Sequence, residues 1–215
     1  MIGLLLEYFI SSLLGYLFGS IPTAYIVLKK AKGIDVTQSG TGNVGAMNSY
    51  EVSGSKKLGI LVFVVDFLKG VIPVLIILQL FGQKYSFAGL TLIFSIFAHC
   101  FNPWLNFKGG RGLATSAGGS VVIAPLLLVI WIIIWLVFYL IKKDILIANI
   151  FATILTLITV LLGSNFYLEY SAIADKSINE LVMLSSIVLI LIFIKHIDPL
   201  NEIINKNKNN KNKND

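Results

Sequence analysis

The chain alternates between long apolar segments and shorter polar segments. Six apolar runs stand out, at residues 4–28, 58–81, 87–105, 113–141, 145–162 and 181–194. A helix needs about 20 predominantly apolar residues to cross a hydrocarbon core about 30 Å thick. This pattern therefore predicts an all-α, polytopic integral membrane protein in which the apolar runs are transmembrane helices.

The fourth run is too long for one ordinary crossing. Its 29 residues would extend about 43 Å as a helix at about 1.5 Å per residue. Pro125 interrupts the run, and proline removes a backbone hydrogen bond inside a helix. The run is therefore either one strongly tilted helix or two short helices that meet at Pro125.

The positions of the basic residues distinguish these two arrangements, because cytoplasmic loops are enriched in lysine and arginine. With the N-terminus outside and two crossings in residues 113–141, fourteen of the 17 Lys and Arg residues lie on the cytoplasmic side. With one crossing, Lys142, Lys143 and the basic C-terminal segment would lie outside. We therefore predict about seven transmembrane helices, with the N-terminus outside and the C-terminus in the cytoplasm.

Composition excludes several classes of protein. The chain is 56% hydrophobic and 13% charged, whereas a soluble domain carries about 25% charged residues. A net charge of +6 would suggest nucleic acid in a soluble protein, but here membrane topology accounts for it and no nucleic-acid partner is expected. The single cysteine, Cys100, excludes an internal disulfide framework and a cysteine-based metal cluster.

The two ends of the chain differ in character. No basic segment precedes the first apolar run, which continues to about Leu28, so it is interpreted as a membrane span and not as a cleaved signal peptide. Residues 205–215 are almost entirely asparagine and lysine and predict a disordered tail that at most contacts anionic lipid. The expected organisation is one membrane-embedded domain, residues 1–204, followed by that tail. Residues 164–180 form an expected external loop that could hold a surface helix.

A glycine-rich loop occupies residues 33–48. Gly40, Gly42 and Gly45 are interleaved with hydroxyl and amide side chains, which allows backbone N–H groups to converge on an anion. This is the outline of a phosphate cradle, and a flexible loop between two helices is the alternative. No Gly-Lys-Ser/Thr sequence follows, so the loop is not a nucleotide-binding P-loop.

A second glycine-rich loop contains two cations, Lys108 and Arg111. Fixed cations, open backbone amides and the start of a helix are the ingredients of a phosphate site. Positive-inside anchoring is the alternative, although anchoring does not require glycines. The glycines are Gly109, Gly110 and Gly112, and Thr115 and Ser116 begin the next helix. Two loops suited to binding anions on one side of the membrane predict one shared site.

Polar residues within the apolar runs are few. Asp66 and Lys69 stand at i and i+3 on one helical face, where each charge can compensate for the other. A structural ion pair and a direct catalytic role are both consistent with this spacing, and we expect the pair to support the floor of the site. His99 and His196 stand at cytoplasmic ends of spans, where a lone histidine more often forms structural hydrogen bonds than acts as a base.

Taken together, four segments resemble those of the bacterial membrane glycerol-3-phosphate acyltransferases that use acyl phosphate as donor. The segments are residues 19–22, 40–48, 66–70 and 99–115. The resemblance implies about seven spans in the bacterial cell membrane and a site that faces the cytoplasm. It also implies transfer of a fatty acyl group from acyl phosphate to glycerol 3-phosphate, which yields lysophosphatidate and inorganic phosphate in the first step of phospholipid synthesis.

The resemblance also assigns roles to residues by position. It implies catalytic roles for Thr41, Asn43 and Lys108. The implied substrate- and phosphate-binding residues are Gly40, Gly42, Gly45, Asn48, Gly109, Gly110, Arg111, Thr115, Ser116 and His196, and the implied supporting residues are Ser20, Asp66, Lys69 and His99. The implied partners are the two substrates, membrane lipid and the acyltransferase that produces acyl phosphate, and the resemblance implies neither a metal nor a cofactor.

Two departures from the family pattern concern the acceptor half of the site. Glu51 stands where the family usually has an arginine that binds the acceptor phosphate, and Pro199 stands where asparagine is expected. A changed acceptor or a lost activity is therefore one alternative, and a transporter or other membrane protein whose glycine loops are gates is another. Neither His99 nor His196 begins a His-x4-Asp sequence, the pairing that many acyltransferases use as a base. We therefore expect the phosphate of the donor to accept the hydroxyl proton.

Overall fold

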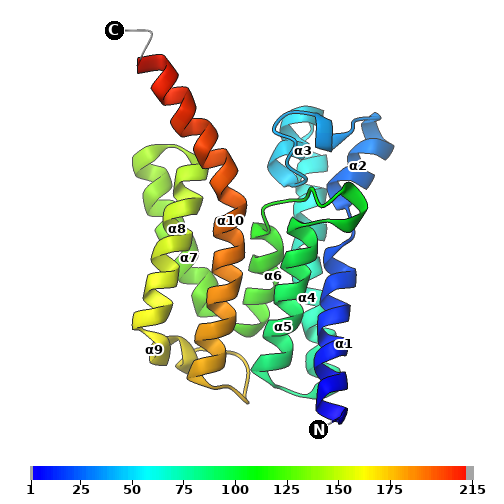
Figure 1. Ribbon diagram of the computed structural model, residues 1–215, viewed down its shortest axis with the longest axis vertical. Helices are drawn as coiled ribbons and strands as arrows, with labels where there is room; N and C mark the ends of the chain where they lie inside the picture. The colour runs from blue at the N-terminus through cyan, green and yellow to red at the C-terminus, as the bar shows by residue number, and fades with distance from the viewer. Residues whose placement is uncertain (1, 212–215) are drawn as a thin grey trace.

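The structure, a computed structural model, describes residues 2–211, which fold into a bundle of roughly parallel and antiparallel helices (Figure 1). The helices are α1 (Ile2–Gly19), α2 (Thr23–Lys32), α3 (Ala46–Ser53), α4 (Lys56–Phe81), α5 (Tyr85–Cys100), α6 (Leu113–Ile123), α7 (Pro125–Lys142), α8 (Ile145–Leu162), α9 (Ser164–Glu169) and α10 (Ile178–Lys211). Two 3₁₀ turns, η1 (Val36–Gln38) and η2 (Pro103–Leu105), lie in the loops. The predicted all-α class is confirmed.

The outer surface of the bundle is apolar. Six helical segments within residues 2–211 are long and apolar enough to cross a membrane. The segment that forms α7 is the clearest case, because its mean hydropathy is 2.5 while only 6% of it is buried inside the protein. A helix that is apolar all round and largely exposed is stable only against lipid. The exposed apolar side chains therefore form the lipid-facing surface of an integral membrane protein.

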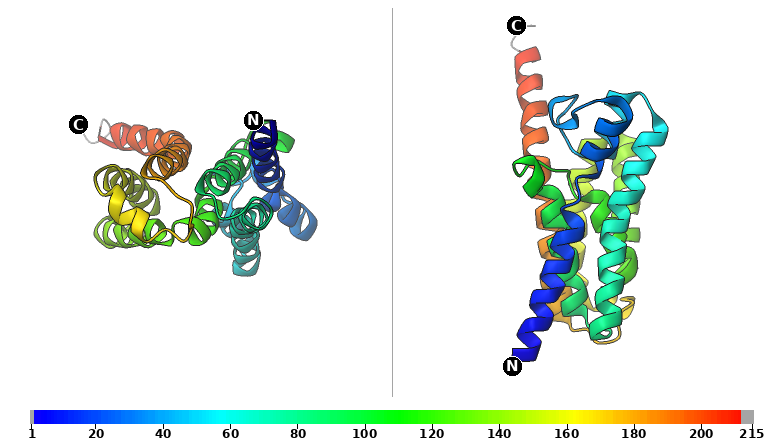
Figure 2. Two further views of the ribbon diagram at one scale, coloured as in Figure 1. Left: turned by 90° about the horizontal axis from the view of Figure 1, so that it is seen from below. Right: turned by 90° about the vertical axis from the view of Figure 1, so that its right-hand side faces the viewer.

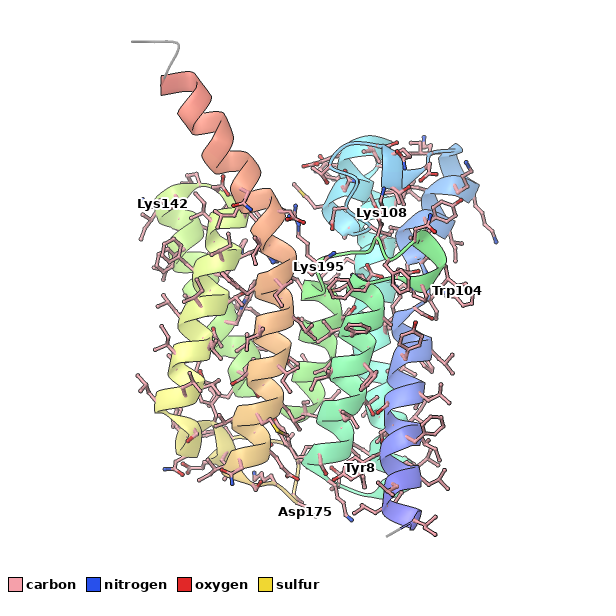
Figure 3. The ribbon with its side chains drawn as sticks, viewed as in Figure 1. Tyr8, Trp104, Lys108, Lys142, Asp175 and Lys195 are labelled. Atoms are coloured by element: carbon pink, nitrogen blue, oxygen red, sulfur yellow. The ribbon has the colours of Figure 1, made fainter. Side chains whose placement is uncertain are left out.

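The fourth apolar run is two helices, as the charge distribution favours. Ala124 separates α6 from α7, and Pro125 is the first residue of α7, where its missing N–H costs no hydrogen bond. The carbonyl of Ile123 accepts hydrogen bonds from the loop at residues 171–172. Figure 3 places Lys142 at the same end of the bundle as Lys108, and Asp175 at the opposite end. The chain therefore reverses direction at Pro125.

The first apolar run differs from the prediction of one uninterrupted span. It breaks after α1 at Ser20–Ile21 and resumes as α2 at Thr23, although the two helices together still form one apolar stretch. Pro22 lacks the N–H that would continue the hydrogen-bond ladder, and its ring disfavours a helical conformation for the residue before it. The break leaves the backbone carbonyls of Ser20 and Ile21 open to side chains of other helices.

The polar segment after α8 forms the surface helix that the sequence allows, and the polar C-terminal part of α10 is more helical than expected. A short surface helix, α9, does form in residues 164–180. At the C-terminal end, α10 continues to Lys211 where the composition predicts a disordered tail, and the remaining predicted tail residues, 212–215, lie outside the described residues. A helix that is already nucleated extends at little cost. The division of the chain at residue 204 stays a prediction.

The helices form two groups that meet along α5, α6 and α10 (Figures 1 and 2). One group contains α1 to α6, in which α1 packs on α5 and α4 on α6; the other contains α7 to α10. The larger apolar core lies along the line where the groups meet. A smaller core lies at the Lys108 end, where Val36 and Val44 of the first glycine-rich loop pack with Ala24, Leu28 and Val62. This second core fixes the loop against α2 and α4.

Candidate functional site

A polar cleft of about 480 Å³ lies at the Lys108 end, bordered by the two glycine-rich loops and α10. Lys108 and Lys195 come from different elements and both lie at this end of the bundle (Figure 3). The cleft is lined by Thr37, Thr41, Gly42, Asn43, Phe101, Phe107, Lys108, Gly109, Arg111, Ile194, Lys195, Asp198 and Pro199. The structure therefore brings the two predicted anion-binding loops into one site.

Asn48 holds the first loop in shape. Its side chain is buried, and its Oδ1 accepts a hydrogen bond from the backbone N–H of Thr41 (3.0 Å). Its Nδ2 donates to the backbone carbonyls of Ser39 (3.0 Å), Asn43 (2.9 Å) and, at longer range, Val36 (3.4 Å). Asn48 thus positions Thr41 and Asn43, which line the cleft, and does not line the cleft itself.

Two glycines of this loop have the left-handed backbone conformation that residues with a side chain rarely adopt. Gly40 has φ +60° and Gly42 has φ +68°. A Cβ on Gly40 would also collide with the side chain of Asn48. These glycines therefore allow the loop to turn. Of the three glycines predicted to bind phosphate in this loop, Gly40, Gly42 and Gly45, only Gly42 lines the cleft.

The start of the loop is closed by Asp35 and Thr37. The hydroxyl of Thr37 donates to Oδ1 of Asp35 (2.7 Å), and the backbone N–H of Thr37 donates to the same oxygen (3.0 Å). These two hydrogen bonds stabilise the carboxylate and lower the pKa of Asp35 below its usual value. Thr37 lines the cleft, so this local turn sets one wall of the site.

Asn102 builds the second loop. Its Nδ2 donates to the carbonyl oxygen of Ser20 (2.8 Å), which the break between α1 and α2 leaves open. Its Oδ1 accepts from the N–H of Trp104 (3.1 Å), and its carbonyl accepts from the N–H of Phe107 (2.9 Å). The loop is thereby tied to the first helix pair, and it presents Lys108 as an exposed side chain at the cleft.

The glycines of the second loop allow it to lie against α5. The N–H of Gly110 donates to the carbonyl of His99 (3.1 Å), and a Cβ on Gly110 would collide with the His99 ring. The carbonyl of Gly109 also accepts, at 3.5 Å, from the N–H of Val44. The two glycine-rich loops therefore contact each other through their backbones, which fixes their relative position.

The predicted Asp66–Lys69 pair forms and lies beneath the loops. Nζ of Lys69 is 2.6 Å from Oδ1 of Asp66 and also donates to the carbonyl of Ile21 (2.6 Å). Both side chains are buried, and His99 Nδ1 lies 3.8 Å from the same carboxylate oxygen. The attraction within a buried ion pair offsets the cost of desolvation only when further hydrogen bonds satisfy the remaining polar atoms of both side chains. The pair joins α4 to the α1–α2 break and to α5, and its supporting role in the site stays a prediction.

Thr115 and Ser116 do not line the cleft. The Thr115 hydroxyl is buried and donates to the backbone carbonyl of Asp66 (2.9 Å), which connects α6 to α4. The Ser116 hydroxyl donates to the carbonyl of Leu113 (2.9 Å). Both hydroxyls therefore satisfy backbone carbonyls in this structure, and the contact with phosphate that the resemblance implies stays a prediction.

His196 also lies away from the cleft. Its ring is buried, its Nδ1 donates to the carbonyl of Ile192 (2.7 Å), and its Nε2 lies 3.4 Å from Nδ2 of Asn149. Because a carbonyl can only accept, Nδ1 carries the hydrogen and Nε2 accepts from Asn149. Oδ1 of Asn149 in turn accepts from Nε1 of Trp135 (2.8 Å). His196 thus joins α10 to α8, and the phosphate contact that the resemblance implies stays a prediction.

Several residues that line the cleft are not among the site residues predicted from the sequence. Lys195 and Asp198 lie one helical turn apart on α10 and face the cleft, whereas His196, about 100° further round the helix, faces α8. Phe101 and Phe107 also line the cleft, and Phe107 does so from a left-handed backbone conformation with φ +59°. The i, i+3 spacing of Lys195 and Asp198 at the end of an apolar run is a signal that could have indicated a shared face.

The cleft combines cations, amide donors and an apolar surround. Lys108, Arg111 and Lys195 are the cations among its described lining residues, and Asp198 is the carboxylate. Cations and backbone amides at one site stabilise phosphate groups and developing negative charge. No group of three or more His, Cys, Asp or Glu residues suited to a metal ion occurs in the described part of the chain. The lining therefore suits anionic substrates that approach at the membrane surface.

Comparison with known proteins gives consistent results. The family described as "Glycerol-3-phosphate acyltransferase" matches residues 9–206. The glycerol-3-phosphate acyltransferase of Helicobacter pylori (strain ATCC 700392 / 26695) is 37% identical over 197 residues, which cover 87% of each chain. That of Ehrlichia canis (strain Jake) is 34% identical over 199 residues, which cover 92% of this chain and 95% of the other.

The fold also matches solved structures. The crystal structure of PlsY (YgiH), an integral membrane glycerol 3-phosphate acyltransferase, in its glycerol 3-phosphate form has a TM-score of 0.76 and 30% sequence identity, and the match covers 93% of this chain and 92% of the other. The lysophosphatidic acid form of the same protein has a TM-score of 0.75 with the same identity and coverage.

Proposed function

The chain belongs to the glycerol-3-phosphate acyltransferase family, and we propose that the cleft is where it uses acyl phosphate as the acyl donor. It is an acyltransferase that acts on glycerol 3-phosphate, and its reaction belongs to phospholipid biosynthesis. The observation that carries the proposal is the cation set of the cleft: Lys108, Arg111 and Lys195 come from two different walls. Two substrates that each carry a phosphate group can then be bound at the same time by positive charges on separate walls of the cleft.

The proposed step is a direct acyl transfer. The glycerol hydroxyl oxygen attacks the carbonyl carbon of acyl phosphate, and the bond between that carbon and the phosphate oxygen breaks. The phosphate leaves with the electron pair of the broken bond and takes the hydroxyl proton. The products are lysophosphatidate and inorganic phosphate. Neither His99 nor His196 is among the described residues that line the cleft, and the lack of a histidine base there supports proton transfer to the departing phosphate.

The two glycine-rich loops supply the stabilising groups for this step. Lys108 and Arg111 neutralise charge that develops on the departing phosphate. Thr41 and Asn43 are placed by Asn48 at the same cleft, where they donate hydrogen bonds to the carbonyl oxygen as it becomes an oxyanion. Loss of one preorganised donor of this kind typically lowers kcat by about 10²–10³. The roles of all these residues are part of the proposal.

The site faces the cytoplasm in this proposal. The Lys108 end carries Lys142 and Lys195 as well (Figure 3), and enrichment in basic residues marks the cytoplasmic side of a membrane protein. We place the protein in the bacterial cell membrane, where a water-soluble acceptor enters the cleft from the cytoplasm and the acyl chain of the donor stays in lipid. An acyltransferase that produces acyl phosphate is the expected source of the donor.

A turnover assay with purified protein tests the proposal. With acyl phosphate and glycerol 3-phosphate together, we expect release of inorganic phosphate and formation of lysophosphatidate. Lys108→Met should lower kcat by about 100-fold or more, while Lys176→Met, at a lysine outside the cleft, should leave it unchanged. Release of phosphate without glycerol 3-phosphate, or full turnover in Lys108→Met, would contradict the proposed donor chemistry.

A further inference from the structure

The α10 wall of the cleft has its own pair of opposite charges. Lys195 and Asp198 both line the cleft and are three residues apart on one helix. Residues at i and i+3 lie on the same helical face, with Cβ atoms about 5–6 Å apart. Facing them across the cleft is the loop that carries Lys108 and Arg111. The two walls therefore differ: one presents two cations, and the other presents a cation and an anion.

Lys195 is held at the cleft by an aromatic ring. Its Nζ lies 4.9 Å from the ring centroid of Phe101, the residue that follows α5 and also lines the cleft. A lysine ammonium over an aromatic face is attracted by the negative face of the ring. Phe101 packs in turn against Phe97, with ring centroids 5.2 Å apart. The contact fixes the ammonium where α10 meets the first helix group.

The other positions expected to bind the acceptor phosphate offer no hydrogen-bond donor among the lining residues. Glu51 lies exposed on α3 and is not among the lining residues. His196 is buried against α8, as described above. Pro199 lines the cleft but offers no donor. Lys195 is therefore the cation among the described lining residues that the glycine-rich loops do not supply.

We propose that Lys195 and Asp198 form the subsite for the acyl acceptor, an inference that rests on the proposed function. Lys195 binds the phosphate of glycerol 3-phosphate. Asp198 repels that phosphate and accepts a hydrogen bond from a hydroxyl at the other end of the molecule. The separation of about 5–6 Å between the Cβ atoms of the two residues is comparable with the span of a three-carbon phosphate ester. The pair thereby orients the acceptor and leaves Lys108 and Arg111 to the donor phosphate.

Steady-state kinetics with both acceptors test this assignment. Lys195→Met should raise KM for glycerol 3-phosphate by about tenfold or more, because a hydrogen bond to a charged group is lost, while KM for acyl phosphate stays within about threefold. The preference for glycerol 3-phosphate over plain glycerol should fall by a similar factor, because only the first carries the phosphate. Lys195→Arg should retain most of the affinity. Asp198→Ala should weaken both acceptors alike.

A matched control is available in the same protein. Lys143 also lies over an aromatic ring, that of Tyr139 at 5.9 Å, but outside the cleft. Lys143→Met should leave both KM values unchanged. Calorimetric titration of glycerol 3-phosphate into the detergent-solubilised protein, without donor, provides a readout that does not depend on turnover. Lys195→Met should abolish the binding signal, and a thermal melt should show that the variant remains folded.

Two results would overturn the inference. One is an unchanged KM and an unchanged binding signal for glycerol 3-phosphate in Lys195→Met. The other is a rise in KM for acyl phosphate with no change for the acceptor, which would place Lys195 at the donor phosphate. A wild-type protein that shows no turnover would contradict the proposed function instead, and the binding titration would then still decide the role of Lys195.

Discussion

Hydrogen bonds of single buried side chains determine the shape of the cleft. Asn48, Asn102 and Lys69 each reach backbone groups of another segment, and none of these three lines the cleft. A backbone carbonyl that is left unpaired inside a protein costs about 1–3 kcal/mol. Each of these side chains therefore stabilises one particular loop conformation relative to others. The residues that face the substrates depend on them for position.

Replacement of Asn48 tests this dependence. Asn48→Ala removes the acceptor for the Thr41 N–H and the donor to the Ser39 and Asn43 carbonyls. We expect kcat/KM to fall by about 10- to 100-fold, because Thr41 and Asn43 lose their fixed positions. Steady-state kinetics with both substrates measure the effect. The matched control is Asn165→Ala, at an exposed asparagine on α9, and equal activity of the two variants would show that Asn48 does not order the loop.

Close packing of helices supports the site from below. The α4–α6 contact places Thr115 against the carbonyl of Asp66, and it requires glycine where the backbones meet. A Cβ on Gly118 would collide with the carbonyl oxygen of Phe67. Small residues at helix interfaces allow this approach in membrane proteins. The Asp66–Lys69 pair lies on α4 at this contact, so the distance between the two helices also sets the position of the pair.

A methyl group at this interface should therefore separate the helices. Gly118→Ala is expected to destabilise the protein by about 1–3 kcal/mol, the usual effect of overpacking. A thermal melt in detergent measures the loss. Gly3→Ala on α1 is the control, because a Cβ there meets nothing within 4 Å; it should be neutral or slightly stabilising. If both variants melt at the wild-type temperature, α4 and α6 are not as closely packed as described.

The arrangement of the whole bundle decides which charges share a side of the membrane. The reversal at Pro125 brings Lys142 to the end that carries Lys108 and Lys195, and it leaves Asp175 at the other end (Figure 3). The two helix groups then meet along α5 and α10, and the Lys195–Phe101 contact joins them at the cleft. The cleft is consequently a property of the assembled groups and not of either group alone.

Cysteine labelling in intact cells tests the orientation. Cys100 is buried, so it should contribute little background to a membrane-impermeant maleimide. Asp175→Cys should react from outside, whereas Lys142→Cys should react only after the membrane is permeabilised, because the positive-inside rule places the Lys142 end in the cytoplasm. External reaction at Lys142→Cys would reverse the proposed orientation of the active site.

The sequence by itself determined the class of protein and the family. Long apolar runs indicate membrane helices because the thickness of the bilayer imposes their length, and basic residues indicate their direction. The glycine and cation pattern of residues 40–48 and 108–112 also identified two loops that do meet at one cleft. These features are local, so spacing and composition are sufficient to recognise them. The same spacing did not distinguish a glycine that lines the site from one that shapes a turn.

Only the tertiary structure decided which side chains face the cleft. Thr115, Ser116 and His196 lie within five residues of a cleft residue in the sequence. Their polar atoms nevertheless bond elsewhere: Thr115 to the backbone of α4, Ser116 to its own helix, and His196 to Asn149 of α8. Lys195 and Asp198 reach the cleft because α10 is rotated so that His196 faces α8. Each residue along a helix turns the side chain by about 100°, and the packing of the two helix groups sets which of these directions opens onto substrate. That rotation depends on contacts between segments far apart in the chain, and no local pattern contains it.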